Sequence, residues 1–390
     1  MSSSFARTPM LLLCVRANNL RCLLKSPIVV VYWTPWFGKQ RRGNDSEFFK
    51  KFSPSNCPVN DILLDGDEHE ILPWCIYTHN QQRARNASAL VFHAPSLSLS
   101  GLPKRNNEQA WVIESMESAA YYSSLTQHSI MRLFNYSMTY RLDSDFPLTY
   151  ARPFSIVQQI SSPLPSGTFT QRKSLTRGEA PILWLASNCR AKNGRSSYVE
   201  ELRKYIPVDC LGGCLLNGPK TPRHKTGEVL KSYKFYLSFE NSNCKDYVTE
   251  KLFRPLKAGV IPIVSGPPGK HGDGYKHFAP TNKSFIFPDA YPHPKLLAEH
   301  LRHVESNETE WMSYMSYRGA EGYKHFSRDF LSVWGKEQYD WGHCGLCRQL
   351  LRIKKHQLMS KERLLPKVVG PDTSCMPPGS LRQLAFRNIS

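Results

Sequence analysis

The chain has no long hydrophobic segment near its start, and acidic residues are scarce in it. The longest early apolar run covers residues 10–15, whereas a bilayer crossing needs roughly 20 apolar residues. We therefore expect residues 1–26 to be an N-terminal segment without a clear membrane anchor. The 32 acidic residues stand against 51 lysines and arginines, which gives a formal net charge of +19. Such a field attracts anions such as nucleic acids, acidic membranes or phosphorylated small molecules.

Several common phosphate and metal motifs are also missing. There is no Gly-x-x-x-x-Gly-Lys-Ser/Thr loop, and no Gly-x-Gly-x-x-Gly opens a helix after a strand, which argues against P-loop and dinucleotide sites. Among 11 cysteines only Cys344 and Cys347 form a Cys-x-x-Cys. Because a structural zinc site normally uses a second such pair, we favour disulfides over zinc. An oxidising, glycosylating compartment is also indicated by six Asn-x-Ser/Thr sequons, at Asn44, Asn86, Asn135, Asn282, Asn307 and Asn388.

Apolar runs separated by polar stretches predict an α/β fold. The 390 residues allow roughly two to three domains, and 41% hydrophobic residues suffice for buried cores. Residues 27–33 form a β-branched run typical of a buried parallel strand. Further strands are predicted over residues 61–64, 74–77, 89–92, 111–113 and 132–134, and later over 181–186, 233–239 and 259–264. Helices are predicted over residues 197–205, 247–258, 294–304 and 308–330.

This alternation occurs twice, so we predict two Rossmann-like domains facing a central cleft, where ligands bind at the carboxyl ends of strands. We expect a first domain over residues 27–160, a linker at 161–180 and a second domain over 181–350 that includes the Cys-x-x-Cys. Residues 351–390 form a basic, proline-containing tail. We expect that tail to be disordered from about Pro366.

Two helix starts in the second half suggest anion sites. Lys251 lies in the first turns of the helix predicted from Tyr247, where a lysine is disfavoured unless it serves a bound anion. Ser197 and Glu200 form a capping box, and Arg195 stands just before it. Since both helices follow strand ends, Arg195 and Lys251 could meet at a diphosphate. Surface positions are the alternative for both side chains.

The first half offers carboxylates. Glu114 and Glu117 follow the strand predicted at residues 111–113, where a general base could face the cleft. The residue pattern alone does not choose between them. Two Asp-x-Asp triplets, at residues 65–67 and 143–145, are similar to metal motifs of sugar-nucleotide enzymes, but turns are the favoured role for both.

From about Ile28 to Leu350 the chain resembles the GDP-fucose-dependent α1,3/4-fucosyltransferases of the GT10 type, plant members most closely. The resemblance is densest in FYLSFENSNCKDYVTEKL followed by AGVIPIV, and further matches are SMES, FNYSMTYRLDSD and the Cys-x-x-Cys. It implies the two-domain GT-B fold, with the acceptor side in the first domain and GDP-fucose in the second. It also implies that Glu117 rather than Glu114 is the catalytic base. The donor-binding positions that it implies are Ser187, Asn188, Arg195, Tyr236, Asn241, Tyr247, Glu250 and Lys251, with Tyr150 as an additional position.

The resemblance carries further expectations. It implies that no metal is required, that a divalent cation is at most stimulatory, and that Asp143 and Asp145 bind none. It pairs Cys344 and Cys347 with Cys57 and Cys75, and allows Cys189 or Cys214 to pair with Cys244. The family consists of type II membrane proteins of the Golgi lumen, so association with that membrane is expected, although the usual anchor is not evident here.

The expected reaction moves L-fucose from GDP-β-L-fucose to a GlcNAc hydroxyl of a glycan or glycoprotein, with inversion. A Lewis-type α1,4 linkage is favoured, and a core α1,3-fucosyltransferase of N-glycans is the alternative. A third hypothesis is a non-catalytic glycan-binding protein on the same fold. Nucleic acid is not an expected partner, because the basic residues are scattered rather than interleaved with aromatics on one face.

Overall fold

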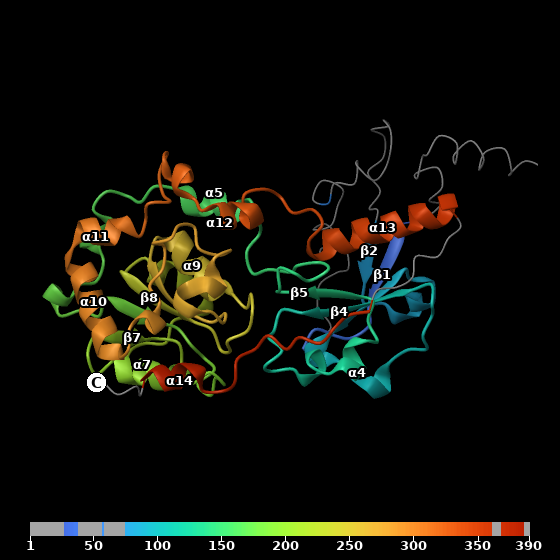
Figure 1. Cartoon of the computed structure of the whole chain (residues 1–390), viewed down its shortest axis with the longest axis horizontal. Helices are drawn as coiled ribbons and strands as arrows, with labels where there is room; N and C mark the ends of the chain where they lie inside the picture. Colours follow the sequence, from blue (N-terminus) through green and yellow to red (C-terminus); the bar gives the residue numbers. More distant parts are fainter. Residues whose placement is uncertain (1–26, 38–56, 58–74, 361–367, 386–390) are drawn as a thin grey trace, which may run out of the picture. The chain divides into compact units, whose positions relative to one another are not determined.

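The protein divides into two compact units, which are described separately (Figure 1). A computed structural model describes residues 27–37, 57, 75–360 and 368–385. The first unit contains the chain up to Leu148 and returns for Gln338–Thr373, and the second contains Thr149–Glu337 and the residues from Ser374 onward. The strand predicted at residues 61–64, the triplet at 65–67 and the first 26 residues lie outside the described part.

The first unit is built on a parallel sheet of five strands in the order β2-β1-β3-β4-β5. The strands are β1 (Ile28–Tyr32), β2 (Cys75–Thr78), β3 (Ala89–His93), β4 (Ala110–Ser115) and β5 (Tyr136–Thr139). Helix α13 (Gly342–Ser360) buries Leu346 and Leu350 against the sheet face that carries Val30, Val91 and Val112. The short helix α4 (His128–Met131) precedes β5. Continuous apolar runs make these strands suitable for burial on both faces.

The second unit contains a parallel sheet of four strands in the order β7-β6-β8-β9. These are β6 (Ile182–Trp184), β7 (Val208–Cys210), β8 (Phe235–Phe239) and β9 (Ile261–Ser265). Its helices are α5 (Ser155–Ser161), α6 (Thr168–Gln171), α7 (Arg195–Leu202), α8 (Thr226–Leu230), α9 (Glu250–Ala258), α10 (Pro294–Ser306), α11 (Glu308–Ser313), α12 (Arg328–Trp334) and α14 (Ser380–Ala385). The reversal of strand order between β7-β6 and β8-β9 is typical of doubly wound folds.

Short 3-10 helices occupy many connections. They are η1 (Gln81–Asn86), η2 (Ala94–Ser96), η3 (Leu99–Gly101), η4 (Ser123–Leu125), η5 (Leu175–Arg177), η6 (Arg223–Lys225), η7 (Lys270–Tyr275), η8 (Pro288–Ala290) and η9 (Gly322–His325). None of the helices in the described part of the chain combines the length and apolar character that a bilayer crossing needs.

Several secondary-structure predictions were wrong, and helices α4, α5, α6, α8, α13 and α14 were not predicted. Residues 132–134 follow helix α4, and the strand begins at Tyr136 instead. Strand β7 was missed, because it has only three residues and the middle one is an aspartate. The helix predicted over residues 308–330 is interrupted between α11 and α12. Gly319 there has a φ of +87°, a conformation that ends helices and that side chains other than glycine rarely adopt.

Three domain boundaries also differ from the prediction. The first unit ends at Leu148 rather than at residue 160, so α5 belongs to the second unit. Residues 161–180 are an integral part of the second unit rather than a linker: Arg172 is buried and donates hydrogen bonds to the carbonyls of Tyr233, at 2.5 Å, and Ala258, at 2.9 Å. The Cys-x-x-Cys helix α13 belongs to the first unit, although it follows the second one in the chain. Its apolar side chains complete the core beneath the first sheet.

Two disulfides attach α13 to the first unit. Cys57 pairs with Cys344 and Cys75 with Cys347, as the family resemblance implied. The pairing of Cys189 or Cys214 with Cys244 was wrong: Cys189 bonds Cys214, and Cys244 bonds Cys375. The described part of the tail is therefore not disordered, since residues 368–385 carry a disulfide and helix α14. Among the described cysteines Cys210 alone is a free thiol, and burial raises its pKa to about 11.

Candidate active site

Helix α9 places Lys251 at the carboxyl end of β8. The helix begins at Glu250, three residues later than predicted, because the Thr249 side chain caps it by accepting from the Lys251 backbone N–H. The Lys251 ammonium lies 2.9 Å from Thr249 Oγ1, 3.1 Å from Glu240 Oε2 and 3.5 Å from Glu250 Oε1. Its side chain is 18% exposed. A cation is thus held at a positive helix end by two carboxylates.

Glu240 is the site residue that sequence reasoning missed. It directly follows β8, is 1% exposed, and accepts hydrogen bonds from the Thr249 backbone N–H at 2.8 Å and its hydroxyl at 2.9 Å. Burial raises the pKa of Glu240, and the charge of Lys251 opposes that shift. The carboxylate joins the strand end to the helix cap and positions Lys251. The sequence did contain a signal for Glu240, because it is an acidic residue directly after a predicted buried strand.

Arg195 lies at the carboxyl ends of β6 and β8. It is the first residue of α7 rather than a residue preceding it, because Gly194, with a φ of +77°, caps the helix in place of Ser197. The Arg195 guanidinium is buried and donates to the carbonyls of Phe239, at 2.7 Å, and Asn188, at 3.1 Å. It therefore joins the two loops that follow these strands. Arg195 and Lys251 converge on consecutive residues, Phe239 and Glu240.

The other predicted donor residues surround the same strand ends with different exposures. Ser187 is exposed and Asn188 partly buried, both just after β6, and Asn241 is partly buried after β8. Tyr236 and Tyr247 lie in the interior, 4% and 2% exposed, and burial raises the pKa of Tyr236.

Glu250 opens helix α9 and keeps its charge. Burial, the largest influence, raises the pKa of this carboxyl, but the nearby charges of Lys251 and Arg254 outweigh it, so the pKa of Glu250 is lowered overall. An ionised carboxylate beside Lys251 can accept hydrogen bonds from sugar hydroxyls.

The first unit separates the two candidate bases. Glu114 is fully buried on β4, on the sheet face that carries Val112 and is covered by α13, and its charge adds to burial in raising the pKa of Tyr77. Glu117 lies past the end of β4 and is partly exposed. The Ser115 hydroxyl holds its backbone by donating to the Glu117 carbonyl at 2.8 Å and accepting from its N–H at 3.1 Å. Of the two glutamates, Glu117 is the one that is partly exposed.

The Asp-x-Asp triplet at residues 143–145 is a turn. Asp143 pairs with Arg141 through two contacts of 2.8 and 2.7 Å, and Asp145 accepts from the Ser137 N–H and hydroxyl, both at 2.8 Å. Within the described ranges, no three His, Cys, Asp or Glu side chains are grouped so that they could hold a metal ion. Tyr150, the additional predicted donor residue, is partly buried at the start of the second unit.

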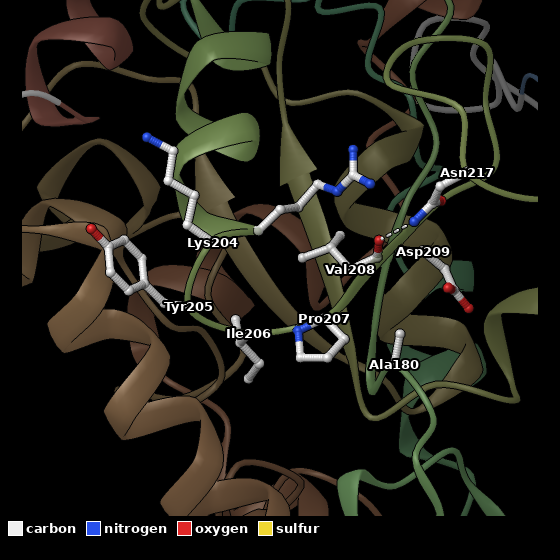
Figure 2. A pocket seen from close by; sticks show the side chains of 9 residues that line it. Ala180, Lys204, Tyr205, Ile206, Pro207, Val208, Asp209 and Asn217 are labelled. Atoms are coloured by element: carbon white, nitrogen blue, oxygen red, sulfur yellow. Dashed lines mark hydrogen bonds between the residues drawn. The ribbon is translucent and has the colours of Figure 1, made fainter.

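The second unit also contains a hollow of about 450 Å³ (Figure 2). It is lined by Ala180, Arg203, Lys204, Tyr205, Ile206, Pro207, Val208, Asp209 and Asn217. Val208 begins β7 and Arg203 follows the last residue of α7, whereas Arg195 begins that helix. The hollow therefore lies at the amino end of the sheet and contains none of the predicted donor residues.

Family comparisons cover both units. The model described as "Glycosyltransferase family 10 (fucosyltransferase) C-term" matches residues 175–363, and "Fucosyltransferase, N-terminal" matches residues 25–151. The chain belongs to the family 10 fucosyltransferases. Crystal structures of α1,3-fucosyltransferases share its fold: one covers 88% of this chain and 93% of its own, with a TM-score of 0.54 and 15% identity. The GT-B prediction of two Rossmann-like domains is thereby confirmed.

Curated relatives carry the name GDP-fucose protein O-fucosyltransferase 3. The chicken protein (Gallus gallus) is 31% identical over 63% of this chain and 53% of its own length. The zebrafish protein (Danio rerio) is 28% identical over 90% of this chain and 74% of its own. The chain thus spans about half the length of the chicken relative.

Proposed function

We propose that this protein transfers L-fucose from GDP-fucose to a hydroxyl group of a glycoprotein acceptor. The observation that carries the proposal is the cation site at the end of β8 in a family 10 fucosyltransferase, where Lys251 is held by Glu240 and Glu250. Loops at the carboxyl ends of parallel strands are where this fold class binds nucleotides. A diphosphate placed there would meet Lys251 and the N-terminus of α9.

The proposed transfer is a single displacement. The acceptor oxygen forms a bond to the anomeric carbon of fucose as the bond from that carbon to the β-phosphate oxygen breaks, so the β-linked donor gives an α-fucoside. Glu117 takes the proton of the acceptor hydroxyl. GDP leaves with the electron pair, and Lys251 and the α9 N-terminus stabilise the negative charge on its phosphate.

These fixed positive groups are the basis for proposing that no metal is required and that a divalent cation is at most stimulatory. Lys251 supplies a full charge, and it lies in the first turn of α9, at the positive end of the helix dipole. Arg195 supports the arrangement by holding the loops that follow β6 and β8.

The acceptor has three candidates. The family resemblance favours a GlcNAc hydroxyl in a Lewis-type α1,4 linkage, with the N-glycan core α1,3 position as the alternative. The relatives are named protein O-fucosyltransferases, and their name favours a serine or threonine hydroxyl of a protein. A non-catalytic glycan-binding role on this fold would leave GDP-fucose unconsumed.

The test is fucose transfer by the full chain, expressed in a secretory host, with and without EDTA. The acceptors are type 1 and type 2 lactosamine, an N-glycan core glycopeptide and a folded, unglycosylated secreted domain rich in serine and threonine. We expect product with at least one acceptor, at a rate that EDTA changes by less than roughly twofold if no metal is required. Binding of GDP without product on any acceptor would contradict the enzymatic proposal and support the glycan-binding one. Loss of activity with EDTA would contradict the metal-independent mechanism.

We further propose a lumenal, Golgi-associated protein, and the sequons give a prediction. Asn86, Asn282 and Asn307 are exposed, so we expect N-glycans on them in a secretory host. Asn135 is 4% exposed, and its side-chain oxygen accepts from the Trp111 N–H at 2.8 Å and from Arg105 at 2.8 Å, so we expect it to remain unmodified.

Glycopeptide mass spectrometry of the folded, secreted protein checks these sites, with Asn→Gln variants at Asn86, Asn282 and Asn307 as controls. A glycan on Asn135 in folded protein would contradict the described packing. Unmodified asparagines at all three exposed sequons would contradict the predicted use of these sites.

A further inference from the structure

The C-terminal segment of residues 374–381 contacts the loop that follows β8. The Cys244–Cys375 disulfide joins the two, and these residues also form an antiparallel bridge. The Met376 N–H donates to the Asn243 carbonyl at 2.7 Å, and the Lys245 N–H donates to the Ser374 carbonyl at 3.4 Å. The loop of residues 241–247 is therefore attached to the tail by the disulfide and by backbone hydrogen bonds of the residues before and after Cys244.

The same segment also holds the loop that precedes α7. The Gly379 N–H donates to the Lys192 carbonyl at 2.7 Å, and the Leu381 N–H donates to the Asn193 carbonyl at 2.8 Å. Leu381, on helix α14, is 1% exposed, and α14 packs on α7, as Figure 1 shows. Arg195 lies two residues beyond Asn193. One tail segment thus binds the two loops that lead into the predicted donor helices α7 and α9.

The Asn193 side chain links the two loops directly. Asn193 is 2% exposed and donates to the Glu240 carbonyl at 2.9 Å and to Asn243 Oδ1 at 2.8 Å. Glu240 in turn positions Lys251 through Thr249. The tail is therefore connected to the Lys251 site through two loops, the one that precedes α7 and the one that follows β8.

The loop following β8 needs such support because its backbone is strained. Asp246 has a φ of +59°, in the left-handed region that side chains other than glycine rarely adopt. Strained conformations persist only when the surrounding structure holds them. The loop contains Asn241 and Tyr247 and ends at the Thr249 cap, so a relaxed backbone would displace several predicted donor groups at once.

We propose that residues 374–381, closed by the Cys244–Cys375 disulfide, are a positioning element of the GDP-fucose site. The tail does not touch the reacting atoms. It holds the loops before α7 and α9 in the conformation that binds the diphosphate, so that the donor does not have to order them. This inference rests on the proposed function, because it assigns the tail to that same donor site.

The test uses the full chain with Cys244→Ser and Cys375→Ser combined, which removes the disulfide without leaving either of its two thiols unpaired. We expect the Kd for GDP and the KM for GDP-fucose to rise roughly 10- to 100-fold, because only a fraction of the molecules would then hold the loops in the binding conformation. We expect kcat at saturating donor to change by less than roughly threefold. Hydrogen exchange across residues 241–247 should become faster.

A second variant keeps the test informative if the first does not fold. Leu381→Ala leaves both cysteines in place, loosens α14 from α7, and should raise the Kd for GDP in the same direction. Two controls are matched to these changes. Gln383→Ala alters an exposed position on α14, and Cys75→Ala with Cys347→Ala removes a disulfide of the first unit.

The outcomes separate this inference from the proposed function. Weaker GDP binding in the tail variants, with both controls near the wild-type value, supports the positioning role. Unchanged GDP affinity in folded tail variants overturns it and leaves the proposed function intact. An equal loss in the Cys75/Cys347 control also overturns it, because the effect would then be general destabilisation. A wild-type protein that neither binds GDP nor transfers fucose overturns the proposed function itself.

Discussion

Replacing Glu117 by glutamine is expected to lower kcat for fucose transfer by about 10²- to 10⁴-fold, the usual contribution of a general base. The amide keeps the size of the side chain but cannot take the proton of the acceptor hydroxyl. Donor binding should persist, because the predicted donor residues belong to the second unit. Steady-state transfer rates measure kcat, and calorimetric titration of GDP measures donor binding.

Glu108→Gln is the matched control for this prediction, since Glu108 is an exposed carboxylate on the loop before β4. Its activity should stay within roughly twofold of wild type, as for surface substitutions generally. Full activity of the Glu117 variant would remove this residue from the mechanism. A Glu114→Gln variant does not substitute for it, because Glu114 is buried in the core beneath α13 and its replacement acts first on folding.

Replacing Lys251 by alanine is expected to weaken GDP binding by about 1.5–3 kcal/mol, the typical contribution of a hydrogen bond to a charged group. This corresponds to a rise of roughly 10- to 150-fold in Kd. Because the proposed partner of Lys251 is the diphosphate, the affinity for guanosine should change much less than that for GDP. Titrating both ligands against the same variant separates loss of the phosphate contact from general damage to the site.

Lys257→Ala provides the control on the same helix, since Lys257 is exposed in the last turn of α9. Its GDP affinity should match that of wild type. Equal GDP affinity in the Lys251 variant would place the diphosphate elsewhere. Thermal unfolding must accompany the titration, because the variant leaves Glu240 buried without the cation that it faces at 3.1 Å.

Helix starts show where sequence patterns gave the correct element but the wrong first residue. The Ser197–Glu200 pattern fits a capping box, yet Gly194 caps α7 through its left-handed backbone. Similarly, Tyr247 continues the apolar pattern of α9, but the Thr249 side chain caps the helix two residues later. Several residues near each start could serve as a cap, and local sequence does not rank them. The shift bears on the proposed donor site, because Arg195 becomes the first residue of its helix.

Local sequence also could not choose between Glu114 and Glu117 as the candidate general base. Alternation along a strand separates two faces, but a parallel strand is buried on both, so polarity does not reveal which carboxylate is accessible. The choice of Glu117 came from resemblance. The structure adds a reason, because α13 covers the face that carries Glu114, and that helix arrives from more than two hundred residues later in the chain.

The sequence by itself determined the α/β class and the two Rossmann-like halves, and its resemblance to known proteins indicated the fucosyltransferase family and the block from Tyr233 to Pro268 that holds most of the predicted donor residues. These properties follow from local patterns of apolar runs and motif residues, which need no knowledge of distant contacts. Only the tertiary structure decided that α13 completes the first unit, that Cys244 bonds Cys375, and that Glu240 supports Lys251. Each of these depends on segments far apart in the chain, or on a side chain's burial, which packing alone sets.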